Sequence, residues 1–458
     1  MELVDFGKYI AKLLKLNGFQ VFFVGGCVRN ILLNRPSDNL DIATDAPPNQ
    51  VEKILRANKI PMRLVGKQFG TILANNNGLK VEITTFRKEG FYKDRRHPGS
   101  VVFTKDMKQD AIRRDFTINA LYLDPQTHEL FDPAKGIRDL RLGLIRFVGD
   151  PKDRIDEDSL RMLRAVRIGV QLGFNIEKNS FAAIKTRAKY VQYVSGERIK
   201  AELDKILSTD PRPGMDLLDH IGLLRFIIPD VEPLKQFSHQ SKKYHLEGNM
   251  WEHTLLALDK AKKENLEVKY ALLFHDIGKP QTAKKVLKKE GWVISTKGHA
   301  DASAQIFLEF AKRIRFSKID KNQVAWLVKN HMLMFDFFNM AIHKQLKLAE
   351  SPAFPLLLKH WQYDEQATKR AVYRDDHHAR YLKSLKVGKK ILARIEASEP
   401  LIEKLANGDM IMRHSKLKPG PLLGRKIEQV KARIIENKLK TESDLKKFLW
   451  RSLRDLNP

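Results

Sequence analysis

Cysteine is almost absent from this chain, which has one, Cys27, among its 458 residues. A single cysteine excludes a disulfide within the chain, and its scarcity favours a reducing cytoplasm over the disulfide-rich secreted class. Long apolar runs are also missing: none approaches the about 18 residues that a membrane helix needs, and there is no secretory leader pattern. We therefore expect a cytoplasmic protein without a membrane partner.

Acidic residues are few relative to basic ones. The chain has 55 Asp and Glu against 83 Lys and Arg, which gives a formal net charge of +28. The simplest physical explanation of this excess is a partner rich in phosphate. A solvated basic surface is the alternative, and charge alone does not separate DNA, RNA and a membrane surface.

Strand signals are nearly absent after Asp153. Before that point, strand-like runs alternate with short helical patterns, which predicts an α/β head built on one sheet. After it, helical periodicity continues to the end, with proline-containing breaks at 210–214, 227–233 and 418–421. The strand-like runs are FQVFFVGG, LDIAT, GTILAN, LKVEITTF, NALYL and GLIRFVG.

A glycine pair ends the first of these runs. In VGGCVRN, Gly25 and Gly26 precede a short helical pattern, so backbone N–H groups can approach a phosphate with no side chain in the way. Arg29, in the first turn of that helix, adds a fork of donors for a triphosphate. Gly-Gly turns after strands are common, so this motif alone has low specificity.

A carboxylate is missing from the next motif, DNLDIAT. Positions 39 and 41 of a strand point to the same side, and they carry Asn39 and Asp41. Two carboxylates there would hold Mg²⁺ against the phosphates of a nucleotide and an attacking hydroxyl. Glu82, in LKVEITTF, offers a further carboxylate from a neighbouring strand. The alternative for Asp41 is a turn or helix-capping aspartate.

Two later motifs carry arginines beside acidic residues. In AIRRDFTINALYL, Arg114 and Asp115 precede an apolar run, and Asn119 follows, a pattern typical of a site rim or of a surface charge cluster. In DEDSLRMLRAVRIGVQLGF, arginines recur at helical spacing after Asp158, which lies one turn before the first. Such a helix can read the pairing edge of a base and hold phosphates, or it can be a solvated basic face with an aspartate at its N-terminus. These arginines are Arg161, Arg164 and Arg167.

Together, these motifs resemble the bacterial class II tRNA nucleotidyltransferase (CCA-adding) and poly(A) polymerase family, closely over residues 20–210. The shared order is G-G-x-V-R, x-x-D-I-A-T, R-R-D-F-T-I-N-A-L and E-D-x-x-R-M-L-R-A-x-R. The resemblance implies an α+β fold: a nucleotidyltransferase-type α/β head with a mixed, five-stranded sheet, followed by an all-helical neck, HD-like body and tail. It also implies that CCA is added to tRNA 3′ ends from CTP and ATP with Mg²⁺.

The resemblance also assigns roles to residues. It places metal binding and catalysis at Asp41 and Asn39, with Glu82 nearby, and it makes Asp158 and Arg161 a protein template that pairs with CTP or ATP. The residues expected to contact the nucleotide are Gly25, Gly26, Arg29, Arg114, Asp115, Asn119, Asp158, Arg161, Arg164 and Arg167.

The chain departs from the family pattern at Asn30 and Asn39, where aspartate is usual. An amide oxygen can bind Mg²⁺ but brings no charge, so the second change should weaken metal binding. Asp38 would replace it only through a bulge, because it points to the opposite side of a regular strand. Three hypotheses follow: tolerance of Asn39, rescue by Asp38, or a weakened transferase site.

Histidines and aspartates further along resemble the HD phosphohydrolase superfamily. YALLFHDIGKP holds His275 and Asp276, WEHTLL holds His253, and Asp364 stands in LLKHWQYDEQA. These ligands suit a divalent metal that activates water against 2′,3′-cyclic phosphates or phosphate esters. A domain kept only as a scaffold is the alternative. His299 and His331 flank the motif.

The resemblance divides the chain into four domains: a nucleotidyltransferase head at 1–150, a neck and RNA-binding region at 151–235, an HD-like body at 236–370 and a basic tail at 371–458. The tail, with KLKPGPLLGRKIEQVKARIIENKLK, is expected to contact the tRNA elbow while the head takes the acceptor end. The competing functions are poly(A) polymerase, addition of CC or A alone, and tRNA binding by a chain whose transferase site has lapsed. The sequence leaves the oligomeric state undetermined.

Overall fold

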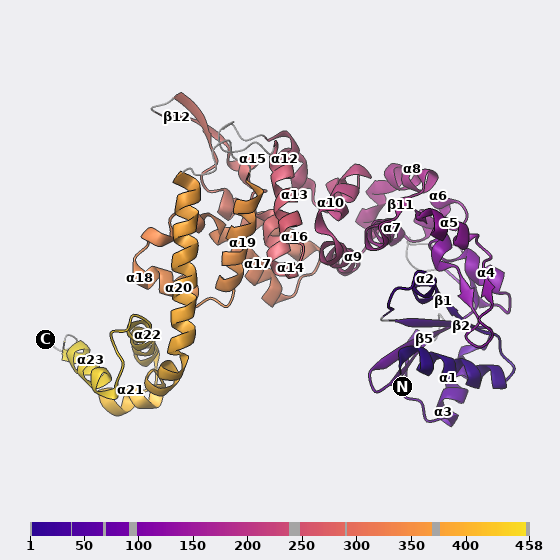
Figure 1. The fold of residues 1–458 in the computed structure, drawn as a ribbon, viewed down its shortest axis with the longest axis horizontal. Coiled ribbons are helices and arrows are strands. Elements are labelled where there is room, and N and C mark those ends of the chain that lie inside the picture. Colours follow the sequence, from indigo (N-terminus) through magenta and orange to yellow (C-terminus); the bar gives the residue numbers. More distant parts are fainter. Residues whose placement is uncertain are drawn as a thin grey trace. The chain divides into compact units, whose positions relative to one another are not determined.

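The computed structural model describes residues 2–37, 39–66, 70–90, 99–237, 248–288, 291–368 and 376–454. The chain forms two compact units (Figure 1). The first consists of Met1–Glu232 and Lys312–Phe316, and the second of Pro233–Ala311 and Ser317–Pro458. Each unit is considered separately below.

The head of the first unit is built on a seven-stranded sheet in the order β3-β4-β5-β2-β1-β8-β9. The pair β2–β5 is parallel and the other neighbours are antiparallel, so the sheet is mixed, as predicted, but has two strands more than the expected five. The strands are β1 (Val21–Val24), β2 (Leu40–Thr44), β3 (Met62–Gly66), β4 (Thr71–Asn76), β5 (Leu79–Thr85), β8 (Tyr122–Leu123) and β9 (Leu130–Phe131).

Helices cover both faces of this sheet. On one face, α1 (Leu3–Leu16) and α3 (Pro48–Ala57) pack against the strands, and Phe23 lies beside Gly7 of α1. On the other face, Phe22 and Tyr122 form an aromatic cluster that Ala111 of α4 (Met107–Ile112) completes. Alternate residues of β1 therefore supply the two cores, as the two-residue period of a strand requires.

Two of the predicted strands are shorter than their sequence runs. In NALYL the strand is only β8, and η2 (Thr117–Asn119) precedes it; in GLIRFVG it is β10 (Leu144–Ile145), which pairs outside the main sheet with β11 (Asn175–Ile176). The body is not wholly helical either, because β12 (Lys284–Lys288) and β13 (Gly291–Ser295) form a hairpin. A further pair joins β6 (Arg87–Glu89) and β7 (Val101–Phe103).

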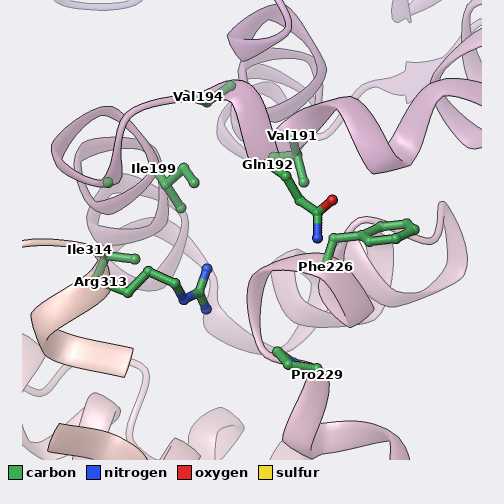
Figure 2. Close-up of a pocket in the computed structure, with 9 residues that line it drawn as sticks. Val191, Gln192, Val194, Ile199, Phe226, Pro229, Arg313 and Ile314 are labelled. Carbon is green, nitrogen blue, oxygen red and sulfur yellow. The ribbon is translucent and has the colours of Figure 1, made fainter. Parts of the chain in front are cut away.

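Apart from the two residues of β11, the regular elements of the neck of the first unit are helices, and α7 packs against α9 and α10. The segment Lys312–Phe316 contacts the neck: Arg313 donates a hydrogen bond to the carbonyl of Ile227, and its side chain lines a cavity of about 330 Å³ (Figure 2). A Cβ on Gly196 would lie 2.2 Å from the Arg313 carbonyl oxygen. The helices are α2 (Gly26–Leu32), α5 (Gly136–Leu142), α6 (Pro151–Glu157), α7 (Leu160–Leu172), α8 (Lys178–Arg187), η3 (Ala188–Tyr193), α9 (Gly196–Thr209), α10 (Pro211–His220), α11 (Leu224–Ile227) and η4 (Pro229–Val231).

In the second unit, α13, α14, α17 and α19 pack together, and α20 to α23 enclose a separate apolar cluster around Ile411, Val430 and Leu445. Within the described parts of both units, no helix has the length and apolarity needed to cross a membrane. The elements are α12 (Glu232–Gln236), α13 (Met250–Lys260), α14 (Leu266–Phe274), α15 (Lys279–Thr282), α16 (His299–Arg313), α17 (Lys318–Asn330), η5 (His331–Phe335), η6 (Phe337–Asn339), α18 (Ile342–Ala349), α19 (Phe354–Ala367), α20 (Asp376–Leu405), α21 (Gly408–Ser415), α22 (Pro421–Ile435) and α23 (Glu442–Arg454).

Candidate functional site

The glycine turn lies directly beside Asp41. Gly25 follows β1 with φ of +80°, a left-handed conformation that favours glycine, and α2 starts at Gly26. A Cβ on Gly25 would lie 3.2 Å from Oδ2 of Asp41 and 3.8 Å from Nη1 of Arg114. The turn, the carboxylate and the arginine therefore converge on one point, and a larger side chain at position 25 would crowd all three.

Asp41 and Glu82 are neighbours across the parallel pair of β2 and β5, where their Cα atoms are in register. Paired residues point to the same side of a sheet, so the two carboxylates share a face. Burial, and then the charge of Glu82, raise the pKa of Asp41 to about 6, against the opposing pull of Arg114 and Arg164. A divalent cation at this point would relieve both the desolvation and the repulsion.

Asn39 lies just outside β2, which begins at Leu40. It is exposed, and its carbonyl accepts a hydrogen bond from the hydroxyl of Ser37 at 2.8 Å. Asp38, the proposed substitute ligand, lies outside the described residues, so rescue by a bulge stays a hypothesis. The described strand itself is regular from Leu40 to Thr44 in its pairing with β5.

Four residues singled out from separate motifs form one chain of hydrogen bonds. Arg29 donates from Nη1 to the Asn119 side-chain oxygen at 2.7 Å, and Asn119 donates to Oδ1 of Asp115 at 3.1 Å. Arg164 donates from Nε to the other oxygen of Asp115 at 2.8 Å. Burial would raise the pKa of Asp115, but Arg164 outweighs it and holds the pKa at about 2, while burial lowers the pKa of Arg29 to about 10.

Arg114 is held by two residues that sequence reasoning missed. It donates to Oδ2 of Asp110 and to the hydroxyl of Tyr122, each at 3.0 Å, and Tyr122 donates to the same Asp110 oxygen at 2.7 Å. Burial would raise the pKa of Asp110, but Arg114 and Arg113 lower it to about 2. Asp110 therefore stays ionised and fixes the guanidinium of Arg114 beside Gly25.

The predicted base-reading pair does not meet through its side chains. Asp158 precedes α7 in an extended conformation and accepts two hydrogen bonds from Arg198, at 3.1 and 2.8 Å. Arg161 donates instead to Glu157 at 2.5 Å and to the carbonyl of Arg113 at 2.9 Å. The role of a base template thus stays a prediction, and it requires these side chains to exchange partners.

Arg167, the last arginine of the predicted stripe, donates to Glu202 at 2.6 Å. Glu202 and Arg198 both belong to α9, within GERIKAELDKIL, a segment that the sequence assigned to RNA binding as a whole and not residue by residue. Helical spacing places both on one side of α9 four positions apart, which is the signal that could have identified them. All three arginines of the stripe on α7 form ion pairs, with Glu157, Asp115 and Glu202 in turn, so the stripe is not a free basic face.

In the second unit, the predicted HD residues lie together in two groups of three ligand atoms. Within each group the ligand atoms lie within 4.8 Å of one another, and every side chain is buried. Oδ1 of Asp364 is 2.9 Å from Nε2 of His253, and Oδ1 of Asp276 is 3.3 Å from Nε2 of His299. The first group is His253, His275 and Asp364, and the second is Asp276, His299 and His331.

The histidine tautomers favour metal binding. Nδ1 of His299 and Nδ1 of His331 each face a backbone carbonyl, that of Thr296 at 2.9 Å and that of Val328 at 2.7 Å. When both Nδ1 atoms donate, both Nε2 atoms carry lone pairs, yet these atoms lie 3.1 Å apart. A cation between them removes that repulsion, and a backbone carbonyl behind the ring is the usual support of a metal-binding histidine.

The charges of this centre also suit a cation. Burial would raise the pKa of Asp276 and of Asp364, but the charge of His275 beside both holds them well below the usual range. Burial would lower the pKa of His275, yet Asp276 and Asp364 raise it to about 10. Lys279 adds an ion pair to Asp276 at 2.7 Å. Two ionised carboxylates are therefore available to a metal.

Comparison with known proteins finds matches in three regions of the chain: the head, the neck and the HD-like body. Residues 21–146 fit the family model described as the poly(A) polymerase head domain, residues 173–235 the probable RNA and SrmB-binding site of polymerase A, and residues 249–350 the HD domain. The chain thus contains regions similar to the head domain of poly(A) polymerases, to an RNA-binding site of that polymerase and to an HD domain.

Curated relatives match somewhat less than half of the chain. The CCA-adding enzyme of Staphylococcus saprophyticus is 40% identical over 209 residues, which are 46% of this chain and 51% of the relative. That of Limosilactobacillus fermentum is 44% identical over 194 residues, 42% of this chain and 46% of the relative. The chain thus spans about half the length of the curated relatives it matches.

The fold is similar over nearly the whole chain to solved structures of CCA-adding enzymes. The Bacillus stearothermophilus enzyme in complex with CTP has a TM-score of 0.68 at 23% identity, covering 99% of this chain and 98% of that one. The Thermotoga maritima enzyme complexed with tRNA has a TM-score of 0.54 at 17% identity, covering 98% and 95%. The predicted fold class of a nucleotidyltransferase head and helical body with an HD domain is confirmed.

Proposed function

We propose that this chain adds CCA to the 3′ ends of tRNA from CTP and ATP. The observation that carries the proposal is the convergence at Gly25, where a Cβ added to the glycine turn would lie 3.2 Å from Oδ2 of Asp41 and 3.8 Å from Nη1 of Arg114. The match of residues 21–146 to the poly(A) polymerase head domain includes this region, and the 40% identity to a CCA-adding enzyme over 209 residues supports the same reaction.

The chain's own residues would position the nucleotide. Backbone N–H groups of the turn at Gly25 and Gly26 face the triphosphate, and the partly buried arginines Arg29 and Arg114 donate to it. Each arginine is pre-oriented, Arg29 by Asn119 and Arg114 by Asp110, so little side-chain entropy is lost on binding.

Asp41 would hold Mg²⁺, with Asn39 and Glu82 as the neighbouring oxygen donors. An all-oxygen donor set fits that cation. When bound, the metal polarises the α-phosphate and favours ionisation of the tRNA 3′-hydroxyl. The residues of the chain keep the two reactants in line while pyrophosphate leaves.

The first experiment is extension of a tRNA that lacks its terminal CCA, with labelled CTP and ATP and Mg²⁺. We expect the full chain to add three nucleotides and stop. Addition of a long A tail would instead identify a poly(A) polymerase, and addition of CC or A alone would identify a partial enzyme. Binding of the tRNA without extension would support the lapsed-site alternative.

The remaining proposals concern partners and organisation. The basic helices of the tail, which include 421–435 with four basic residues, would contact the tRNA elbow through its phosphates. A cytoplasmic location and the four-domain division at 150, 235 and 370 stay predictions. The matched RNA-binding region at 173–235 supports a neck that touches RNA.

We propose a second activity, metal-dependent hydrolysis of phosphate esters or 2′,3′-cyclic phosphates, at the HD centre. It rests on the two buried ligand groups, to which the adjacent residues His275 and Asp276 contribute one ligand each. We expect Asp276→Asn to reduce hydrolysis of a 2′,3′-cyclic nucleotide by about a hundredfold or more, because a charged metal ligand is lost. The matched control is Asp301→Asn, on the exposed side of α16, and chelation should abolish hydrolysis by both proteins.

Hydrolysis that survives in the Asp276→Asn chain would contradict this second proposal. CCA addition should continue in that variant, because its transferase residues are unchanged. The two activities are therefore separable in one preparation.

A further inference from the structure

His360 lies beside the HD centre and has no assigned role. It belongs to α19, its side chain is fully buried, and neither ring nitrogen has a hydrogen-bond partner among the described residues. A buried imidazole carries one donor and one acceptor, and leaving both unsatisfied is costly. A core position of this kind would be better filled by leucine unless the ring binds something.

The position of His360 on its helix favours metal binding. Asp364, a member of the first ligand group, follows four residues later on α19, so the two side chains occupy one face of the helix one turn apart. This i, i+4 spacing allows two residues of one helix to bind the same ion, as in the paired histidines of zinc-binding helices.

The ring distances agree with a shared ion. Two imidazoles bound at about 2.1 Å to one tetrahedral ion have ring centroids about 5 Å apart. The rings of His360 and His275 are 5.4 Å apart, and those of His253 and His275, in the same ligand group, are 5.5 Å apart. The ring of His331 is 5.9 Å from that of His360, although His275 and His331, in different groups, are 5.3 Å apart. Ring spacing is therefore compatible with a shared ion, and the helical spacing from Asp364 assigns His360 to the first group.

We propose that His360 is the fourth protein ligand of an ion held by His253, His275 and Asp364. Asp276, His299 and His331 then hold a second ion that keeps an open position. Four protein ligands are typical of a closed, tightly held zinc-type ion, and three are typical of an ion that binds water or substrate. The proposal rests on the second proposed function, hydrolysis at the HD centre, and extends it by giving the two ions different roles: one is retained, and the other binds water or substrate.

The ligand chemistry identifies the class of metal. Three imidazoles and one carboxylate suit a divalent transition metal such as Zn²⁺ or Co²⁺ better than Mg²⁺, which prefers oxygen ligands. Zinc is therefore the probe for stoichiometry, and cobalt is the probe for the ligand set.

The first test is zinc retained per full-length chain, and the affinity of each ion, after removal of metal and titration with Zn²⁺. We expect two ions in the unchanged protein. His360→Leu should weaken the tighter ion by about tenfold to a hundredfold and leave the other within a few-fold. His343→Leu, the same change at an exposed position on α18, is the control and should bind both ions normally.

The second test places a thiol in the proposed coordination sphere. His360→Cys loaded with Co²⁺ should show a thiolate-to-cobalt absorption band, as the thiol releases its proton to solvent and the sulfur–cobalt bond forms. The unchanged chain, whose only cysteine is Cys27 in the head, provides the background spectrum. This measurement stays decisive if the leucine variant does not fold.

Equal zinc affinities in His360→Leu and the unchanged chain would overturn the proposal, as would a cobalt-loaded cysteine variant without the band. A single retained ion in the unchanged chain would overturn the two-ion arrangement. If the protein binds two ions and shows the cobalt band but hydrolyses nothing, the ligand set is supported and the hydrolase function is rejected. Failure of the ligand assignment and failure of the hydrolase proposal are therefore distinguishable.

Discussion

Asp41→Asn is expected to lower the rate of CCA addition by about a thousandfold or more, equivalent to about 4 kcal/mol of transition-state stabilisation. With Asn39 already neutral, Asp41 is the charged member of the pair at the start of β2. Its replacement leaves two amides at these positions and only Glu82, on the neighbouring strand, to attract the cation. Single-nucleotide extension of a truncated tRNA measures the loss.

The same substitution should stabilise the metal-free protein at neutral pH. Burial and Glu82 raise the pKa of Asp41 from 3.8 to about 6, so its ionised form is disfavoured in the folded state. A raised carboxyl pKa means that stability falls as the pH rises between about 4 and 6, and the cost is fully present at pH 7. Asparagine removes a cost of about 1–3 kcal/mol there and none at pH 4.

Asp45→Asn is the matched control, because Asp45 follows the same strand and accepts from the backbone of Gln20 at 2.8 Å, away from the turn. It should keep transfer activity. Thermal unfolding with a chelator at pH 4 and pH 7 measures the stability difference. An Asp41→Asn protein that extends tRNA, or that melts lower than the unchanged chain at pH 7, would contradict this account of the site.

Asn39→Asp is expected to lower the Mg²⁺ concentration for half-maximal transfer by about tenfold or more, because each added carboxylate increases the charge offered to the cation. Asn39 is exposed, so the new charge costs little in folding. A titration of extension rate against Mg²⁺ measures the effect, and Asn77→Asp, in the exposed turn after β4, controls for added charge on the same sheet.

The outcome decides between the hypotheses for Asn39. Extension by the unchanged chain that improves in the variant means that an amide supports the reaction at a higher metal requirement. Extension by the variant alone means that the nucleotide pocket is present and the metal site has lapsed. An unchanged Mg²⁺ requirement would show that position 39 does not contact the metal.

Sequence reasoning located residues whose placement depends on local geometry. The two-residue period of a strand fixed the side to which Asp41 points, and the left-handed turn explains why Gly25 stands where it does. His275 and Asp276 are adjacent in the chain, so one helix end delivers both to the HD centre. In each case, a few neighbouring residues are enough to predict where the side chain lies.

Partners supplied by distant segments could not be predicted in the same way. Arg198 lies 40 residues after Asp158, and Glu202 lies 35 residues after Arg167; they meet only because α7 packs against α9. Asp110 could have been predicted as a partner of Arg114, since it precedes Arg114 by one helical turn. Tyr122 could not, because the sheet brings it to Arg114 from a distant part of the chain. The basic stripe was therefore interpreted without the acidic residues that oppose it.

Short or lysine-rich strands were also missed. The strand β3, MRLVG, is short and is an edge of the sheet, and β12, KKVLK, resembles the lysine-rich helices around it. In both cases pairing with the next strand, β4 or β13, decides the conformation. Pairing is a tertiary contact, and local composition does not encode it.

The close approach of Gly196 to Arg313 limits how this chain can be divided or recombined. Because the first unit takes Lys312–Phe316 from within the HD region matched at 249–350, no single cut in the gene separates the two units as intact modules. A chimaera joined near residue 232 would pair the neck of one parent with the 312–316 segment of the other. Such a chimaera requires a glycine at position 196 of the neck, opposite the backbone of Arg313. Without it, the neck and the 312–316 segment have to come from the same parent.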